Sequence, residues 1–245
     1  MKNLIILSCL LLFATSAGAA GRAVDYEMAG QSFEGYYVSP SPRAPLVFLI
    51  HDWDGLGSYE IKRSEMLSEM GYAVFAADLF GKGIRPAEIA ERRRLTEALY
   101  KDRARLRASL KASLEAARSQ GADIGNAVAA GYCFGGAAVL ELARAGADLK
   151  GFVSFHGGLE TPPGQDYSKV EGRILVLHGT ADSSVTMEDF AALAKNLEKA
   201  GVPHEMITYG GAPHAFTVLG GDRYRKDADE KSWRRFGFFL KETLK

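Results

Sequence analysis

The chain has 245 residues, of which 47% are hydrophobic and 24% are charged, as in an ordinary globular protein. Its length suits one large α/β domain better than two complete domains. Lys and Arg together number 30, and so do Asp and Glu, so no net charge draws the protein to nucleic acid or to an anionic membrane. We therefore expect a small-molecule partner that is bound in a pocket.

The first twenty residues are predicted to be an export signal. Lys2 precedes an apolar run from Leu4 to Phe13, and Ala17-Gly18-Ala19 matches a signal-peptidase site. The run is too short to cross a bilayer, which needs about 20 apolar residues. We expect a cleaved signal peptide over residues 1–20 and a periplasmic or secreted mature domain over residues 21–245, without stable membrane association. The alternatives are an N-terminal anchor and a buried strand.

Cleavage of the signal would leave the mature protein with one cysteine. The chain has two, and Cys9 lies in the predicted signal. Cys133 would then be a single thiol in an oxidising compartment, with no second cysteine to pair with. Such a thiol calls for burial, for a chemical task, or for both.

Apolar, strand-like segments alternate with helix-like segments along the rest of the chain. The predicted strands span residues 33–38, 46–50, 72–77, 127–132, 151–155, 173–178 and 204–209. The predicted helices span residues 60–70, 86–120 (continuous or broken), 136–145, 187–200 and 229–244. This alternation predicts one α/β domain with a mostly parallel sheet and helices on both faces. Ligands of such sheets bind beyond the carboxyl ends of the strands.

The helical region 86–120 carries a basic run that has two interpretations. The run comprises Arg92, Arg93, Arg94, Arg103, Arg105 and Arg107. It would form an anion site if the arginines faced a ligand. Because the acidic residues Glu91, Glu97 and Asp102 are interleaved with it, we interpret it as a solvated helix face.

Cys133 lies in a segment with the spacing of a nucleophile elbow. Gly131-Tyr132-Cys133-Phe134-Gly135 has the G-x-nucleophile-x-G pattern between an apolar strand and an apolar helix, with cysteine where serine is commoner. The glycines suit the close approach of strand and helix around a strained central residue. The helix N-terminus below the side chain favours a thiolate. The alternative is a glycine-rich turn that holds a core cysteine.

The residues that would complete a catalytic triad follow in the order nucleophile, acid, histidine. Asp182 lies in a loop of small residues after the strand 173–178, and His214 lies in the loop after the strand 204–209. Of the five histidines, only His204 and His214 follow Asp182, and His204 begins its strand instead of following it. We expect His214 to be the base and Asp182 to fix its tautomer. The alternatives are an incidental loop histidine and an aspartate that caps the next helix.

An oxyanion hole is expected from two backbone N–H groups. One belongs to Phe134, which follows the nucleophile, and the other belongs to the loop after the strand 46–50. That loop reads His51-Asp52-Trp53-Asp54-Gly55-Leu56-Gly57, and Trp53 is the expected donor.

These segments together resemble the dienelactone hydrolase family, the carboxymethylenebutenolidase-like proteins of the α/β-hydrolase superfamily. The similarity is carried by residues 51–56, 76–81, 131–136, 178–182 and 214–216, which span nearly all of the mature chain. The Gly-Tyr-Cys-x-Gly-Gly elbow is the specific part, since most relatives with this fold use serine. The resemblance implies hydrolysis of an ester, or of a strained enol lactone, through a thiol acyl-enzyme without cofactor or metal.

The resemblance also implies roles for two further residues. Members of the family place a glutamate near the thiol to help activate it, and the matching position here is Asp52. They hold a substrate carboxylate with an arginine, whose place is taken here by Lys82. The alternative for Lys82 is a surface loop lysine. A second family arginine has no counterpart in residues 217–220.

Other functions remain open on the sequence alone. An exported carboxylesterase with a different substrate would use the same residues. A binding protein that kept the fold and lost catalysis belongs to another class, as does a redox thiol sensor, although the mature chain lacks a resolving cysteine. We expect a monomeric enzyme.

Overall fold

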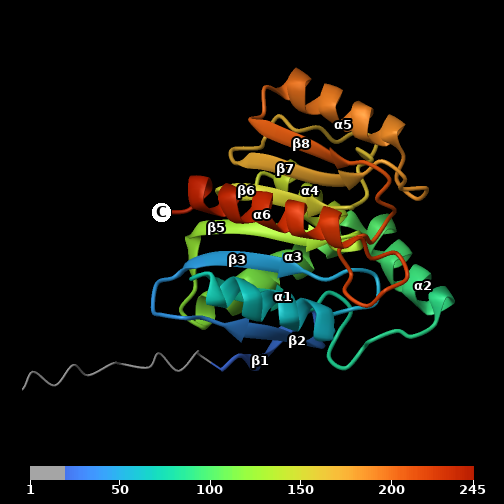
Figure 1. Cartoon of the computed structure of the whole chain (residues 1–245). Coiled ribbons are helices and arrows are strands. Elements are labelled where there is room, and N and C mark those ends of the chain that lie inside the picture. The colour runs from blue at the N-terminus through green and yellow to red at the C-terminus, as the bar shows by residue number, and fades with distance from the viewer. Residues whose placement is uncertain (1–19) are drawn as a thin grey trace, which may run out of the picture.

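The centre of the molecule is a twisted sheet that is seen from one face in Figure 1, a computed structural model in which residues 20–245 are described. Its strands lie in the order β1-β2-β4-β3-β5-β6-β7-β8. β1 and β2 pair antiparallel, as do β2 and β4, and the other neighbours are parallel. The strands are β1 (Arg22–Met28), β2 (Gln31–Val38), β3 (Pro45–Ile50), β4 (Ala73–Ala77), β5 (Asp123–Tyr132), β6 (Gly151–Phe155), β7 (Arg173–Gly179) and β8 (His204–Tyr209).

Helices cover both faces of the sheet. In Figure 1, α1 and α6 lie in front of the sheet, and α3 and α4 lie behind it. Each layer of helices packs against one face of the sheet and forms a hydrophobic cluster with it, so both faces of the parallel strands are buried. The helices are α1 (Ser58–Glu69), α2 (Ile89–Lys101), α3 (Arg103–Ser119), α4 (Phe134–Arg144), α5 (Met187–Ala200) and α6 (Lys226–Thr243).

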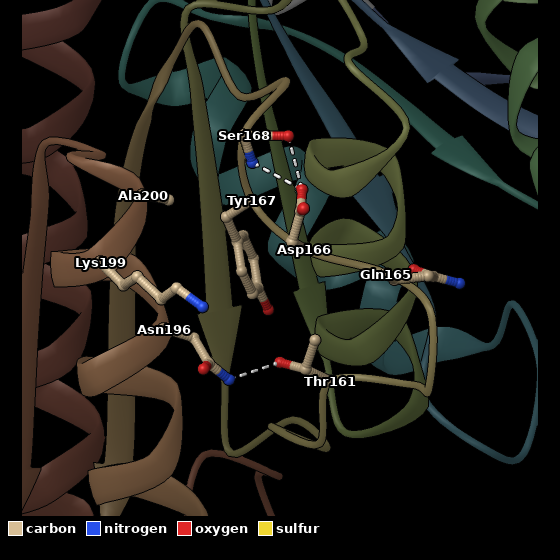
Figure 2. Close-up of a pocket in the computed structure, with 8 residues that line it drawn as sticks. All are labelled: Thr161, Gln165, Asp166, Tyr167, Ser168, Asn196, Lys199 and Ala200. Carbon is tan, nitrogen blue, oxygen red and sulfur yellow. Dashed lines mark hydrogen bonds between the residues drawn. The ribbon is translucent and has the colours of Figure 1, made fainter.

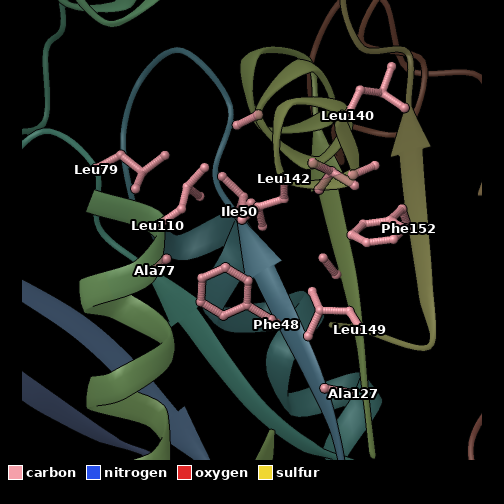
Figure 3. Close-up of a cluster of buried hydrophobic side chains, with 14 of the residues drawn as sticks. Phe48, Ile50, Ala77, Leu79, Leu110, Ala127, Leu140, Leu142, Leu149 and Phe152 are labelled. Atoms are coloured by element: carbon pink, nitrogen blue, oxygen red, sulfur yellow. The ribbon is translucent and has the colours of Figure 1, made fainter. Parts of the chain in front are cut away.

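The alternation of side chains along β3 shows why its sequence is apolar throughout. Leu46, Phe48 and Ile50 enter the cluster shared with α3 and α4, part of which is shown in Figure 3. Val47 and Leu49 enter the opposite cluster, which is shared with α1 and α6. All five side chains are fully buried. Successive strand residues point to opposite faces, so a strand covered on both sides needs an unbroken apolar run.

The structure confirms the predicted α/β fold and changes some boundaries. The helical region 86–120 is broken at Asp102, whose carboxylate accepts a hydrogen bond from Arg105 N at 2.9 Å and caps α3. β1 escaped the sequence analysis because it is an edge strand with mostly exposed side chains. The predicted signal peptide lies, apart from Ala20, outside the described residues, so it stays a prediction. None of the described helices is long and apolar enough to cross a membrane.

Candidate active site

Three predicted site residues meet at the carboxyl edge of the parallel sheet. Cys133 follows β5, Asp182 follows β7, and His214 follows β8. His214 Nδ1 lies 2.7 Å from Asp182 Oδ2, and His214 Nε2 lies 3.1 Å from Cys133 Sγ. The imidazole therefore links a carboxylate to a thiol through its two nitrogens, which is the arrangement of a nucleophile, a base and an orienting acid.

Cys133 is held in a strained backbone conformation between β5 and α4. Its φ is 51° and its ψ is −112°, a region that L-residues rarely adopt. A Cβ on Gly131 would lie 2.3 Å from the backbone of Gly135, and a Cβ on Gly135 would lie 2.3 Å from the carbonyl oxygen of Ile50. Only glycine allows strand and helix to approach this closely, so the sharp turn that presents the thiol depends on both positions.

The loops of Asp182 and His214 are tied to one another by backbone bonds. Ala181 N donates to Ala212 O at 3.0 Å, which joins the two loops directly. Asp182 Oδ1 accepts hydrogen bonds from Ser184 N and Val185 N at 2.8 and 2.9 Å, so its second oxygen is left to face His214. These contacts fix the carboxylate before any substrate arrives.

The electrostatics of the site favour a protonated His214. Burial by itself lowers the pKa of this imidazole, but the hydrogen bonds to Asp182 and Cys133 outweigh it and raise the pKa to about 10. Burial raises the pKa of Asp182, but the hydrogen bond and the charge of His214 outweigh burial, so the pKa of Asp182 lies below its usual range. The site therefore stabilises an imidazolium between two groups that can each carry negative charge.

A pocket of about 360 Å³ is lined by Cys133 and His214, and also by Trp53 and Phe134, the two residues expected to supply the oxyanion hole. Phe134 is the first residue of α4, so its N–H has no carbonyl four residues earlier in the helix to bond. Among the backbone hydrogen bonds of the loops, turns and helix caps in residues 20–245, none has Trp53 N or Phe134 N as its donor. Both residues expected for an oxyanion hole thus border the thiol.

Asp52, which the family resemblance implies as a group that helps to activate the thiol, lies in the loop after β3. Its carboxyl accepts a hydrogen bond from Asp54 N at 2.9 Å, and within the described part of the chain no hydrogen bond joins it to Cys133. Burial and the neighbouring Asp54 and Glu60 raise the pKa of Asp52 to about 10. Activation of the thiol by Asp52 stays a prediction.

Lys82 also lies away from the pocket. Its ammonium group pairs with Asp25 on β1 and lies 3.7 Å from Glu34 on β2. The reason is the turn after β4: Asp78 Oδ1 accepts hydrogen bonds from Phe80 N and Gly81 N, and Lys82 N donates to Ser32 O of β2. The segment therefore follows β2 toward the sheet edge. The surface-lysine alternative describes this placement, and Lys82 is not brought to the thiol.

Two arginines that the sequence analysis did not select line the pocket in its place. They are Arg93 on α2 and Arg223 in the loop before α6. Within residues 20–245 neither guanidinium takes part in an ion pair, and no acidic residue lines the pocket. Arg92 explains the placement of Arg93, because it stacks over Trp53 at 5.5 Å and so docks α2 on the oxyanion loop. The solvated-face interpretation holds for Arg94, which pairs with Glu91.

The carboxylates of Asp52, Asp54 and Glu60 are the group in the described chain that best fits a metal ion. Their oxygens lie within 4.8 Å of one another. However, Glu60 accepts a hydrogen bond from Gly57 N at 2.9 Å and one from Asp52 N at 3.5 Å. These bonds hold the loop between β3 and α1, so the cluster has a structural task.

A smaller cavity of about 240 Å³ lies between the loop after β6 and α5 (Figure 2). Asn196 Nδ2 donates to Thr161 Oγ1 at 3.1 Å, and Asp166 Oδ1 accepts from both Ser168 N and Ser168 Oγ. The polar groups bond to one another and tie the loop to the helix. None of the residues around Cys133 lines this cavity.

The architecture is that of an α/β-hydrolase: a mostly parallel sheet with a sharp turn at Cys133 after β5, and with Asp182 and His214 in later loops. The model of the dienelactone hydrolase family matches residues 33–244. The chain belongs to this family of hydrolases.

Individual relatives agree with this assignment. A protein of Synechocystis sp. named "Putative carboxymethylenebutenolidase" is 25% identical over 232 residues, which cover 86% of this chain and 92% of the relative. The crystal structure of P91, a dienelactone hydrolase-like promiscuous phosphotriesterase from metagenomic libraries, is 31% identical with a TM-score of 0.87. It is matched over 93% of this chain and 100% of its own. Thermogutta terrifontis esterase 2 shares the fold, with 18% identity, a TM-score of 0.65 and coverage of 93% of this chain and 95% of its own.

Proposed function

We propose that the protein hydrolyses carboxylic esters or lactones with Cys133 as the nucleophile, His214 as the base and Asp182 as the orienting acid. The observation that carries this proposal is the continuous link Asp182–His214–Cys133 at the floor of the pocket. A structural cysteine would need neither a histidine on its sulfur nor a carboxylate behind that histidine. The proposal needs no cofactor.

The geometry supports a two-step reaction. The Cys133 sulfur attacks the carbonyl carbon, and the oxyanion that forms accepts hydrogen bonds from Trp53 N and Phe134 N. The C–O bond to the alcohol then breaks, and His214 Nε2 gives its proton to the leaving alkoxide, which leaves a thioester on Cys133. Water attacks the thioester while His214 takes its proton, the C–S bond breaks, and the carboxylic acid leaves with the Cys133 thiolate and the protonated His214 restored. A lactone gives one hydroxy acid by the same steps.

A panel of esters and lactones tests the proposed activity. Wild-type protein is incubated with neutral and anionic aryl esters, alkyl esters and enol lactones, and the released acid is measured. Trapping of a thioester on Cys133 by intact mass would support the mechanism and would exclude a binding protein without catalysis. Absence of turnover and of a thioester with every activated ester would contradict the proposal.

We further propose that the substrate carries an anionic group. Arg93 and Arg223 supply two positive charges to a pocket without a lining acid. An arginine binds a carboxylate through a planar fork of two parallel hydrogen bonds. This proposal replaces the role that the resemblance implied for Lys82.

Replacing both arginines should weaken selection for anionic substrates. We expect Arg93→Met with Arg223→Met to lower kcat/KM about tenfold for an ester with a free carboxylate, and to leave its matched amide within about twofold. The ratio of kcat/KM values for the pair is measured at low and high salt, since screening should narrow the gap.

Lys82→Met is the matched control, because it also removes a positive charge but lies on the β1–β2 edge. Its ratio of kcat/KM values should equal that of wild type. Equal losses on both members of the ester pair in the arginine variant would overturn the anionic-group proposal and leave the hydrolase proposal intact.

Phosphotriester hydrolysis is a second candidate activity. It is favoured by the 31% identity to P91, which is described as a promiscuous phosphotriesterase. Cys133 would attack phosphorus in place of carbon, and the aryloxide would leave with a phosphorylated thiol on the enzyme. Turnover of a diethyl aryl phosphate, compared with turnover of the matched aryl acetate, decides which reaction is faster.

We also propose that the protein is exported and acts as a monomer. The signal pattern over residues 1–20 supports export, and the linked residues Asp182, His214 and Cys133 of one chain are sufficient for the proposed chemistry of a monomer. Protein isolated from its producing cells should begin near Ala20 or Gly21 and contain one titratable thiol without a disulfide. Intact-mass analysis of that protein checks this, and a retained Met1 or a lipid on Cys9 would contradict it.

A further inference from the structure

The turn that carries His214 is bound to the rest of the molecule through Thr217, which is fully buried. Thr217 Oγ1 lies 2.8 Å from Tyr59 Oη on α1 and 2.8 Å from His156 Nε2 after β6. Thr217 O accepts a hydrogen bond from Arg63 Nη2 at 2.9 Å. One residue of the turn therefore bonds to a helix and to the end of a neighbouring strand.

Arg63 anchors the phenol of Tyr59. Its Nε donates to Tyr59 Oη at 3.3 Å, because a guanidinium has donors and no acceptor. The Tyr59 oxygen has a second lone pair, so its bond to Thr217 Oγ1 can run in either direction. His156 Nε2 bonds to Thr217 Oγ1 in either tautomer, and its Nδ1 has no hydrogen-bond partner among the described residues. Arg63 is held in turn by a buried ion pair with Asp229 of α6.

His156, the histidine bonded to Thr217, packs directly against His214. The two rings meet edge to face, with centroids 5.4 Å apart. Burial, followed by the nearby charge of His214, lowers the pKa of His156 well below its usual range, so the imidazole is neutral. A neutral ring can pack on an imidazolium without repelling it. His156 thus packs beside the imidazole of His214, which bonds to both Asp182 and Cys133.

The backbone around this contact needs to be held. Ala215, next to His214, has φ of 62°, and His156 has φ of 38°, and both values are unusual for residues with a side chain. Such conformations persist only where surrounding bonds fix them. The bonds made by Thr217 lie two residues beyond Ala215 and include one to His156 itself.

We propose that Thr217 is a positioning residue that sets the orientation of His214 toward the Cys133 thiol, through its bonds to His156, Tyr59 and Arg63. This role rests on the proposed function of His214 as the base. Thr217 does not line the pocket, so we expect it to contribute to the alignment of the imidazole and not to substrate binding.

Thr217→Val tests the proposal, because it keeps the shape of the side chain and removes the hydroxyl. We expect kcat to fall about 10–100-fold, as a small misplacement of a catalytic group can cost on the order of 100-fold in rate. KM should stay within about twofold. Alkylation of Cys133 by iodoacetamide at neutral pH should slow several-fold, since a misaligned His214 stabilises the thiolate less. Thr217→Ser restores the hydroxyl and should return kcat to within about threefold of wild type.

Ser113→Ala provides the matched control. Ser113 is a buried hydroxyl on α3 that bonds to Ser109 O and to Tyr26 Oη, away from the site. It should lower Tm while kcat and the alkylation rate stay unchanged. Tyr59→Phe, which removes the hydroxyl bonded to Thr217, takes the place of Thr217→Val if that variant does not fold, and kcat and the alkylation rate should again fall.

The outcomes separate this inference from the proposed function. An unchanged kcat and an unchanged alkylation rate in Thr217→Val, with only Tm lowered, would show a purely structural role and overturn it. A second outcome combines two results: Thr217→Val slows alkylation of Cys133, and the wild-type protein cleaves no ester. That outcome would support the role of Thr217 in aligning His214 and would contradict only the proposed hydrolase activity.

Discussion

Cys133→Ala is expected to lower kcat by on the order of 10³-fold or more for every ester that the wild type cleaves. The variant lacks the sulfur that forms the bond to the acyl carbon. Hydroxyl groups of Thr96, Tyr100 and Ser184 also line the pocket, but none of them is hydrogen-bonded to His214. The measurement is steady-state turnover of an activated aryl ester, with correct folding checked by thermal unfolding.

Chemical modification gives an independent readout of the same thiol. One equivalent of an alkylating agent should abolish turnover in the wild type, because Cys133 is the free cysteine of the described chain and is partly accessible. Cys133→Ser keeps a nucleophilic oxygen next to His214 and should retain more activity than the alanine variant. An alanine variant with most of its activity left would refute the assignment of the nucleophile.

His214→Ala is expected to cause a loss comparable with that of Cys133→Ala. Without the imidazole, nothing takes the thiol proton or returns it to the leaving alkoxide. Because the two residues act as one unit, the double variant should be little slower than either single variant. His204→Ala is the control: His204 Nδ1 lies 2.7 Å from Val202 O at the opposite end of β8, and its loss should leave kcat near that of wild type. A large loss in His204→Ala alone would contradict this placement of the base.

The pH dependence of turnover should carry the signature of His214. The pKa of this imidazole is raised to about 10, above its ordinary value near 6.5, so the ring stays protonated in the folded enzyme until the pH passes about 10. Turnover should decline above that pH, since the leaving alkoxide then finds no proton. The same sign applies to stability: the contribution of the imidazolium is complete below about pH 6.5 and is lost as the pH rises through about 10.

Asp182→Asn should move the alkaline decline to lower pH, because the carboxylate bond is one of the contacts that raise the pKa of His214. It should also slow turnover by permitting the wrong tautomer. A pH–rate profile of the two proteins with one neutral ester checks both effects. An unchanged alkaline limb would mean that Asp182 does not govern the protonation of His214.

Much of the fold and the core of the candidate site follow from local sequence patterns. An unbroken apolar run such as residues 46–50 has few solutions other than a strand buried on both faces. The glycines at 131 and 135 leave a sharp turn around Cys133 as the arrangement that avoids a steric clash. Because parallel strands end at one edge, Asp182 and His214 were expected at that edge from their place after a strand alone.

Tertiary structure decided which charged side chains face the thiol. Lys82 and Arg93 are both cations in polar surroundings, and no local pattern distinguishes one at the sheet edge from one at the pocket. Lys82 is drawn away by the hydrogen bonds of Asp78 and by the acids of β1 and β2, whereas Arg93 is carried inward because its neighbour Arg92 docks on Trp53. The raised pKa of Asp52 likewise depends on burial and on the nearby carboxyls of Asp54 and Glu60. The sequence by itself determined most of the elements and the chain order of Cys133, Asp182 and His214 after their strands, since steric and apolar constraints act locally. The packing of distant segments determined the charge of the pocket and the bonds behind His214, because those depend on contacts between residues more than 100 positions apart, such as Tyr59 and Thr217.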